Sequence, residues 1–332
     1  MVLYLNFPLG YTYPIHCTLL KKPIMNNDIA PSALLPTQPT LSGETRGMLL
    51  GLVGVAMFSM TLPFTRMAVA EFDPAFVALG RALAATALGA IWLRRNRAAW
   101  PPKSAPLPLG LVSLGCVIGF PWLTSIALQT LPAAHGAVLV GILPLATALF
   151  STLRGNEKPS AGFWIMALLG STIVIGYALR QSGGRFHLAD LLMFGAVVLG
   201  AIGYAEGGRL SQTMGGQAVI SWALVLSAPL LAPLVLWLSW PRLDTFAHAS
   251  FHAWIGFVYV SVFSMFIGFF FWYRGMALGG IARVGQVQLV QPFMTLMGAA
   301  LLLGEPLALS NVVFALAVIA VIAAGRRMQI RR

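Results

Sequence analysis

A run of 50 residues without a formal charge, between Lys103 and Arg154, constrains this chain more than any other feature. As one helix it would be about 75 Å long at 1.5 Å per residue. That is more than twice the roughly 30 Å thickness of a bilayer's hydrocarbon core. The run must therefore fold back on itself, and Pro132 marks the turn. We predict two membrane spans here, at about 108–129 and about 133–153.

Composition agrees with a membrane protein. Of the 332 residues, 58% are hydrophobic and 9% are charged, whereas a soluble domain has about 25% charged residues. Too few charged groups are present to cover a soluble surface, but ten spans of about 20 residues would fit within the chain. The composition predicts a polytopic membrane protein and excludes a soluble enzyme, a disordered chain and a disulfide scaffold.

The remaining charges delimit eight further spans. We therefore predict an all-α polytopic membrane protein with ten transmembrane helices, the other eight at about 47–65, 74–93, 161–179, 188–206, 218–240, 253–273, 284–304 and 306–325. Most of the 21 Lys and Arg residues then lie on the side of the termini, and four lie opposite: Arg66, Arg180, Arg185 and Arg242. Positive residues mark the cytoplasmic side. We expect both termini in the cytoplasm, with the chain in the bacterial inner membrane.

The two ends of the chain differ from the rest. Residues 1–46 hold six prolines and no long apolar run, so we expect a disordered tail. Lys21 and Lys22 follow the weak apolar patch, which is the reverse of a secretory signal. The sequence leaves open whether Met25 is the true start. Residues 326–332 form a basic C-terminal tail.

Two stretches of the chain resemble each other. They read 127-ALQTLPAAHGAVLVGILPLATALFSTLRGNE-157 and 277-ALGGIARVGQVQLVQPFMTLMGAALLLGE-305. Each begins with Ala-Leu and has a mid-span proline, Pro144 or Pro292. Each reaches a glutamate 13 residues after that proline, Glu157 or Glu305. Chance similarity between apolar helices is the alternative, but the identical spacing favours an internal repeat.

A second, weaker similarity relates the segment 64-FTRMAVAEFDPAF-76 to the segment 207-GGRLSQTMGGQAV-219. The repeats then cover residues 47–180 and 188–325, with five spans each. Since five is odd, the second half would enter the membrane in the opposite sense. The sequence thus predicts two inverted five-helix repeats, an architecture of many secondary transporters.

These residues resemble the EamA family of the drug/metabolite transporter superfamily. The resemblance rests on the two Ala-Leu…Pro…Gly-Glu blocks, on 59-SMTLPFTRMAV-69 and on 200-GAIGYAEGGRLSQ-212. It implies ten helices, a central cavity between two EamA repeats, and export of small metabolites, amino acids or drug-like solutes. The first block departs from the family, because Asn156 separates Gly155 from Glu157. We interpret Glu157 and Glu305 as helix caps or interface anchors.

Three ionisable residues within spans are candidate substrate-binding groups. Arg81 lies inside a span, where a charge normally faces a cavity or a partner. It is a candidate contact for an anion, and a structural pair is the alternative. Glu206 is a candidate protonatable site near the inner gate, although Arg209 at i+3 favours a local ion pair. His135 is a candidate proton-coupling residue, against a backbone hydrogen bond.

Four neutral residues complete the candidate site. Gln288 and Gln291 share a helix face beside Pro292, and a proline within a span frees a backbone carbonyl. They could form a polar cavity wall or pair with another helix. Trp122 and Tyr204 are the aromatic candidates, although most aromatics here are expected at the interface or in packing.

Two further features are read as structural. Arg66 is interpreted as part of an interfacial charge cluster with Glu71 and Asp73. Two Gly-x-x-x-Gly pairs, at Gly47 with Gly51 and at Gly115 with Gly119, would permit close helix packing.

No motif indicates catalysis or a bound cofactor. The sequence lacks a phosphate-binding G-x-x-x-x-G-K-[ST] loop, a zinc pattern and a nucleophile elbow. Cys116 lies in an apolar stretch and is expected to pack as a small hydrophobic residue. We predict a non-enzymatic secondary transporter with no cofactor or metal, whose partners are a small-molecule substrate and the bilayer, not nucleic acid. A homodimer is compatible with the sequence. A channel-like facilitator and an intramembrane enzyme are the alternatives.

Overall fold

The computed structural model describes residues 43–153, 160–181, 187–280 and 284–327, and these segments are helical, without strands. The first half of the described chain contains α1 (Gly43–Ser59), α2 (Thr61–Val69), α3 (Pro74–Arg95), α4 (Pro106–Val112), the π-helical η1 (Ser113–Gly119), α5 (Phe120–Ala127), α6 (Ala133–Val140), α7 (Leu143–Leu153) and α8 (Ala161–Gln181). The second half contains α9 (Leu188–Met214), α10 (Gly216–Ser239), η2 (Trp240–Arg242), α11 (Leu243–His248), α12 (Phe251–Tyr259), the π-helical η3 (Val260–Ile267), α13 (Gly268–Gly279), the 3₁₀-helical η4 (Gly285–Val290), α15 (Gln291–Leu303) and α16 (Leu309–Arg327).

Seven helical segments are long and apolar enough to cross a membrane. These segments are Thr45–Val69, Pro74–Arg95, Pro106–Ala127, Ala133–Leu153, Leu188–Met214, Gly216–Arg242 and Phe251–Gly279. Three further helices are also apolar but shorter, at 164–177, 287–303 and 309–321. The described chain therefore has seven spanning helices by length and composition, and the three shorter ones are compatible with the ten expected.

Helix boundaries depart from expectation where charges lie within helices. The sixth predicted span, 188–206, continues as α9 to Met214. Glu206 and Arg209 lie within it as an i, i+3 ion pair, and the helix ends only at Gly215, whose φ is 82°. The turn predicted at Pro132 is present, since α5 ends at Ala127 and α6 begins at Ala133.

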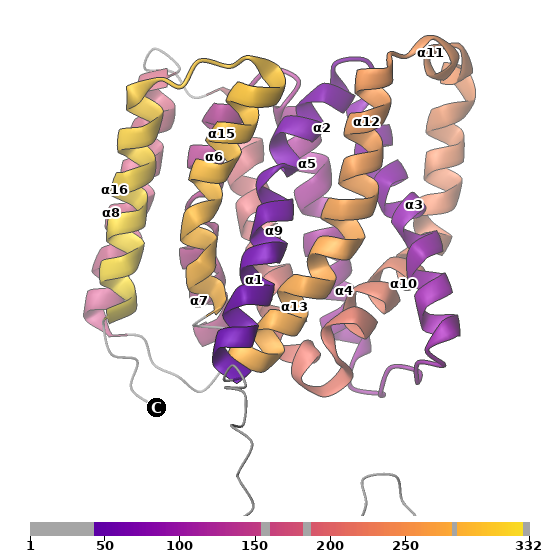
Figure 1. The fold of residues 1–332 in the computed structure, drawn as a ribbon, viewed down its shortest axis with the longest axis horizontal. Helices are drawn as coiled ribbons and strands as arrows, with labels where there is room; N and C mark the ends of the chain where they lie inside the picture. The colour runs from indigo at the N-terminus through magenta and orange to yellow at the C-terminus, as the bar shows by residue number, and fades with distance from the viewer. Residues whose placement is uncertain (1–42, 154–159, 182–186, 281–283, 328–332) are drawn as a thin grey trace, which may run out of the picture. The chain divides into compact units, whose positions relative to one another are not determined.

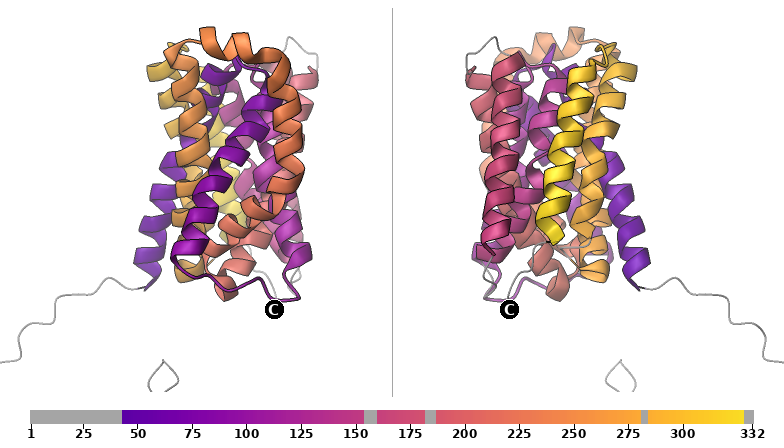
Figure 2. Two further views of the ribbon diagram at one scale, coloured as in Figure 1. Left: turned by 90° about the vertical axis from the view of Figure 1, so that its right-hand side faces the viewer. Right: turned by 90° about the vertical axis from the view of Figure 1, so that its left-hand side faces the viewer.

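Helices far apart in the sequence lie side by side. In Figure 1, α8 and α16 pair at one side of the bundle, α6 and α15 come next, and α3 and α10 pair at the opposite side. The turned views of Figure 2 keep α8 beside α16. Each of these pairs joins a helix of the first half to the corresponding helix of the second half.

Glycines allow two further helix pairs to approach closely. On α1, a Cβ at Gly47 would lie 2.5 Å from the backbone nitrogen of Gly279, and one at Gly51 would lie 2.5 Å from a Val284 methyl group. Gly115 of η1 likewise faces the backbone of α9. The close packing predicted from the two Gly-x-x-x-Gly pairs is therefore confirmed, and it joins α1 to α13 and η1 to α9.

Irregular turns recur at corresponding places in the two halves. The π-helical turn η1 begins at Ser113 and η3 begins at Val260, 147 residues later. The helix that contains Pro144 is interrupted at Gly141, and the helix that contains Pro292 begins with the 3₁₀ turn η4. Such turns within helices are frequent at functional sites.

Candidate functional site

A small pocket lies among the helices where these irregular turns meet. Its volume is about 30 Å³, which leaves room for only a few water molecules, since one needs about 10–15 Å³ of such space. The residues that line it come from both halves: Phe58, Thr61, Leu62, Arg81, Cys116, Phe120, Val140, Gly200, Tyr204, Ser264, Met265, Phe269 and Gln291. We call it the central pocket. At this volume the structure is closed around it.

Arg81 is the charged residue of the central pocket. Its side chain, on α3, is 1% exposed, so it does not reach the interface. Its Nη1 donates a long hydrogen bond of 3.4 Å to the hydroxyl of Thr65, and its Nε is buried without a partner among the described residues. A buried guanidinium carries five N–H donors. Most of its hydrogen-bonding capacity is therefore unused by the described residues.

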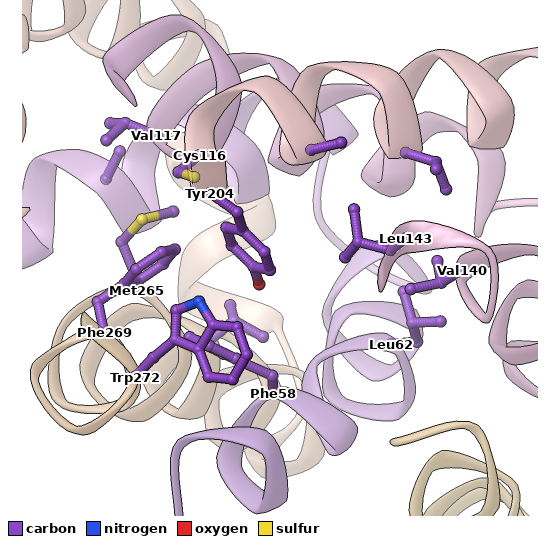
Figure 3. Close-up of a cluster of buried hydrophobic side chains, with 14 of the residues drawn as sticks. Phe58, Leu62, Cys116, Val117, Val140, Leu143, Tyr204, Met265, Phe269 and Trp272 are labelled. Atoms are coloured by element: carbon purple, nitrogen blue, oxygen red, sulfur yellow. The ribbon is translucent and has the colours of Figure 1, made fainter. Parts of the chain in front are cut away.

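Tyr204 brings an aromatic wall to the same pocket. Its ring, on α9, lies 6.1 Å from the ring of Phe58, 6.0 Å from Phe269 and 5.6 Å from Trp272, measured between centroids. Figure 3 shows its hydroxyl pointing into the space between this aromatic group and Leu143. The pocket thus has one side of packed rings and one polar phenol tip.

The two candidate glutamines differ in position. Gln291, at the start of α15, lines the central pocket. Gln288, on η4, is 1% exposed but is not a lining residue, and neither its amide nitrogen nor its amide oxygen has a partner among the described residues. The structure therefore brings Arg81, Tyr204 and Gln291 together and leaves Gln288 outside the pocket.

A larger and more open pocket lies near the ends of α5, α6 and α15. It has a volume of about 730 Å³ and includes Arg66, His135, Tyr177, Glu305 and Asn311 in its lining. We call it the vestibule. The carboxylate of Glu305 accepts hydrogen bonds from two backbone N–H groups, those of Ala133 at 2.9 Å and Ala134 at 2.8 Å.

Glu305 thus caps the N-terminus of α6, where a negative charge meets free N–H groups and the positive end of the helix dipole. This agrees with the interpretation of Glu305 as a cap. The corresponding interpretation of Glu157 lies outside the described residues.

His135 meets a carboxylate rather than the backbone carbonyl considered as its alternative. Its Nε2 lies 2.8 Å from an oxygen of Asp190, which is fully buried. The other carboxylate oxygen accepts the backbone N–H of His187 at 3.2 Å and so caps α9. The pair joins the start of α6 to the start of α9 at the wall of the vestibule.

Two candidates lie away from both pockets. Glu206 is buried and accepts a hydrogen bond of 2.7 Å from Arg209, which confirms the local ion pair expected at this spacing. Trp122, on α5, is 40% exposed. Neither residue is among those that line the central pocket or the vestibule.

The proposed charge cluster of Arg66, Glu71 and Asp73 was wrong. Arg66 donates to the carbonyls of Leu128 and Leu131 and lies 3.5 Å from Glu305. The carboxylate of Glu71 instead accepts hydrogen bonds from Ser250, while Asp73 caps α3 and pairs with Arg242 at 3.0 Å. The three charged side chains therefore have separate partners and do not contact one another as a cluster.

Sequence reasoning missed several groups that the structure brings to these pockets. Thr61 and Ser264 share a hydrogen bond of 2.8 Å beside the central pocket, although they are 203 residues apart. Asp190 was not singled out either. Its signal was available, because an acidic residue at the third position of a helix is typical of a capping box.

Comparison with known proteins agrees with this architecture. The model of the EamA-like transporter family matches the chain twice, over residues 45–179 and 187–324. An uncharacterized transporter of Bacillus subtilis (strain 168), YdeK, is 47% identical over 287 residues, which is 86% of this chain and 99% of that protein. The chain therefore belongs to the EamA-like transporter family, and it is an integral membrane protein.

A solved structure shares the fold. A crystal structure of a protein that is 16% identical superposes with a TM-score of 0.58, over 85% of this chain and 96% of that chain. At this identity the likeness shows the fold alone.

Proposed function

We propose that this protein is a secondary transporter that exports a small metabolite, amino acid or drug-like solute by alternating access. The substrate binds in the central pocket, between two inverted five-helix repeats at 47–180 and 188–325. Opening toward one side and then the other requires the two repeats to rock about this pocket. The proposal makes the chain a ten-span protein of the inner membrane.

The pairing of helices supports the inverted repeats. Corresponding helices of the two halves contact each other in the pairs α3 with α10, α6 with α15, and α8 with α16. Two further contacts are related to each other by the same symmetry. The first span contacts the eighth through α1 and α13, and the third span contacts the sixth through η1 and α9. This is the pattern that a two-fold axis within the membrane plane would produce.

The central pocket is the observation that carries the transport proposal. Both repeats line it, and it is nearly closed, with polar groups and rings facing inward. A continuous channel would need an open polar path, whereas a pocket of about 30 Å³ has room for only a few water molecules. A closed intermediate is what alternating access requires between its two open states.

The two ends of the described chain support the orientation. Figure 1 shows α1 beginning and α16 ending at the same end of the bundle, opposite α11. Lys and Arg are concentrated near that end, so we propose that both ends face the cytoplasm. A reporter active outside the cytoplasm should be silent after Arg332 and active within 181–187. Activity after Arg332 with silence within 181–187 would contradict the orientation, and activity at both places would contradict the number of spans.

Transport itself is tested in proteoliposomes loaded with a panel of labelled amino acids, organic acids, amines and drugs. We expect at least one solute to leave these vesicles in a saturable manner and faster than it leaves loaded vesicles that lack the protein. A facilitator would carry solute down its gradient but would show no acceleration by excess substrate on the opposite side. Failure of every solute class to cross would overturn the transport proposal.

A further inference from the structure

We propose that the central pocket binds an organic monocarboxylate with an apolar, ring-sized body, in preference to a zwitterion or an amine. This inference rests on the proposed function, because it names the substrate class of the same pocket. It starts from the charge balance among the lining residues and from the groups that lack protein partners.

The charge balance favours a single negative charge on the ligand. None of the described lining residues is Asp or Glu, so Arg81 has no counter-ion in the pocket. The described ion pairs join other residues, and Glu206 is bonded to Arg209. A charge within a membrane is costly unless it is neutralised. A monocarboxylate gives a neutral pocket, a zwitterion leaves one positive charge, and an amine gives two.

Hydrogen-bond geometry favours a carboxylate as the anion. The guanidinium of Arg81 has one weak bond to Thr65 and a buried Nε without a partner. Its planar fork matches two carboxylate oxygens. The hydroxyl of Tyr204 and the amide of Gln291 lie in the same lining. These groups supply further donors to an anion held by Arg81.

The apolar wall favours an organic body over an inorganic ion. Phe58, Phe269 and the ring of Tyr204 pack within 6.1 Å of one another. Phe120 and Met265 complete this wall. Chloride would neutralise Arg81 but would gain nothing from aromatic surface, whereas a ring of the ligand gains burial and stacking. Binding requires the closed pocket to open, as alternating access already demands.

Three probes of one shape test the inference: 3-phenylpropionate, phenylalanine and phenethylamine. Labelled 3-phenylpropionate is bound to the purified full-length protein in detergent and displaced by each unlabelled compound. We expect displacement by 3-phenylpropionate itself, at least about tenfold weaker displacement by phenylalanine, and none by phenethylamine or chloride. Equal displacement by phenylalanine or phenethylamine, displacement by chloride alone, or no binding of 3-phenylpropionate would each overturn the inference.

Variants connect the result to Arg81. Arg81→Gln should weaken binding roughly 100-fold, because it removes a buried charged partner, and Arg81→Lys should retain part of the affinity. Arg95→Gln is the matched control, since Arg95 lies on the same helix but is exposed. If Arg81→Gln fails to fold, Gln291→Leu provides the second test and should weaken binding several-fold. Unchanged binding in a folded Arg81→Gln protein would refute the assignment.

This design separates the two proposals. Arg81-dependent binding of 3-phenylpropionate without transport of any solute would support the site and overturn the transport proposal. Transport of an amino acid or amine, with no carboxylate binding, would overturn the monocarboxylate inference and leave the transport proposal standing.

Discussion

Glu305 offers a sharp test of how the two halves are joined at the vestibule. Its carboxylate is 172 residues from Ala133, yet it holds the first two N–H groups of α6 at 2.9 and 2.8 Å. The side chain is 13% exposed and lies 3.5 Å from Arg66. Replacing it by alanine leaves two donors without acceptors at the start of a helix that lines the vestibule.

The magnitude follows from these contacts. Loss of a capping side chain costs about 1 kcal/mol, with a range of about 0.5–2. The carboxylate adds up to about 2 kcal/mol from the helix dipole when partly buried. The partly exposed pair with Arg66 adds less than about 1 kcal/mol. We expect Glu305→Ala to destabilise the start of α6 by about 2–3 kcal/mol, and Glu305→Gln to cost about half as much because one acceptor remains.

Hydrogen exchange in peptides that contain Ala133 and Ala134 measures this loss directly. A local cost of about 2–3 kcal/mol corresponds to roughly 30- to 150-fold faster exchange when the helix start closes again faster than its open form exchanges. Arg66→Ala is the comparison, and the double variant should show coupling below about 1 kcal/mol. A change of less than threefold in Glu305→Ala would refute the capping role.

Three further predictions use other contacts. Gly115→Ala should lower the thermal midpoint in detergent, because its methyl group would overlap the backbone of α9 at a cost of about 1–3 kcal/mol, whereas Gly110→Ala, with nothing within 4 Å, should not. The hydroxyl and the backbone N–H of Ser250 hold the pKa of Glu71 below its ordinary value of 4.5. The contact is therefore complete above pH 4.5 and lost as the pH falls through the lowered pKa. The protection factor of amides at the start of α12, which is the exchange rate of an unstructured chain divided by theirs at the same pH, should therefore fall there in the wild type and stay constant in Glu71→Gln. Asp190→Ala should lower the thermal midpoint more than His135→Ala, because the carboxylate also caps α9; equal losses would contradict this.

Much of the helical arrangement could be predicted, because a helix that crosses a membrane needs a long run of apolar residues. Charged residues are rare within spans, so residues such as Arg66 and Lys103 indicated where spans end. In the structure they lie within a few residues of helix ends. The prolines and glutamates at matching spacing indicated the repeat, which the family comparison supports by matching twice. The end of α9 was predicted too early, because charges were taken to end spans although Glu206 and Arg209 pair within this helix, which runs on to Met214.

The candidate site was predicted in part. Arg81, Tyr204 and Gln291 were selected one at a time, for burial cost or chemistry, and they line one pocket. Gln288 and Trp122 were selected by the same reasoning and do not. Gln288 lies one turn before Gln291, on η4, and Trp122 is 40% exposed, so their positions along and around the helices leave them outside the pocket.

The sequence by itself determined that the chain is a helical membrane protein, with a repeat and a buried arginine. It did so because hydrophobic length, charge spacing and proline position are local properties. Tertiary structure alone decided which groups meet: Thr61 with Ser264, Glu305 with the start of α6, and His135 with Asp190. Hydrogen bonds act over about 3 Å, while these partners are separated by 203, 172 and 55 residues. Their identity therefore depends on how helices of the two halves pack.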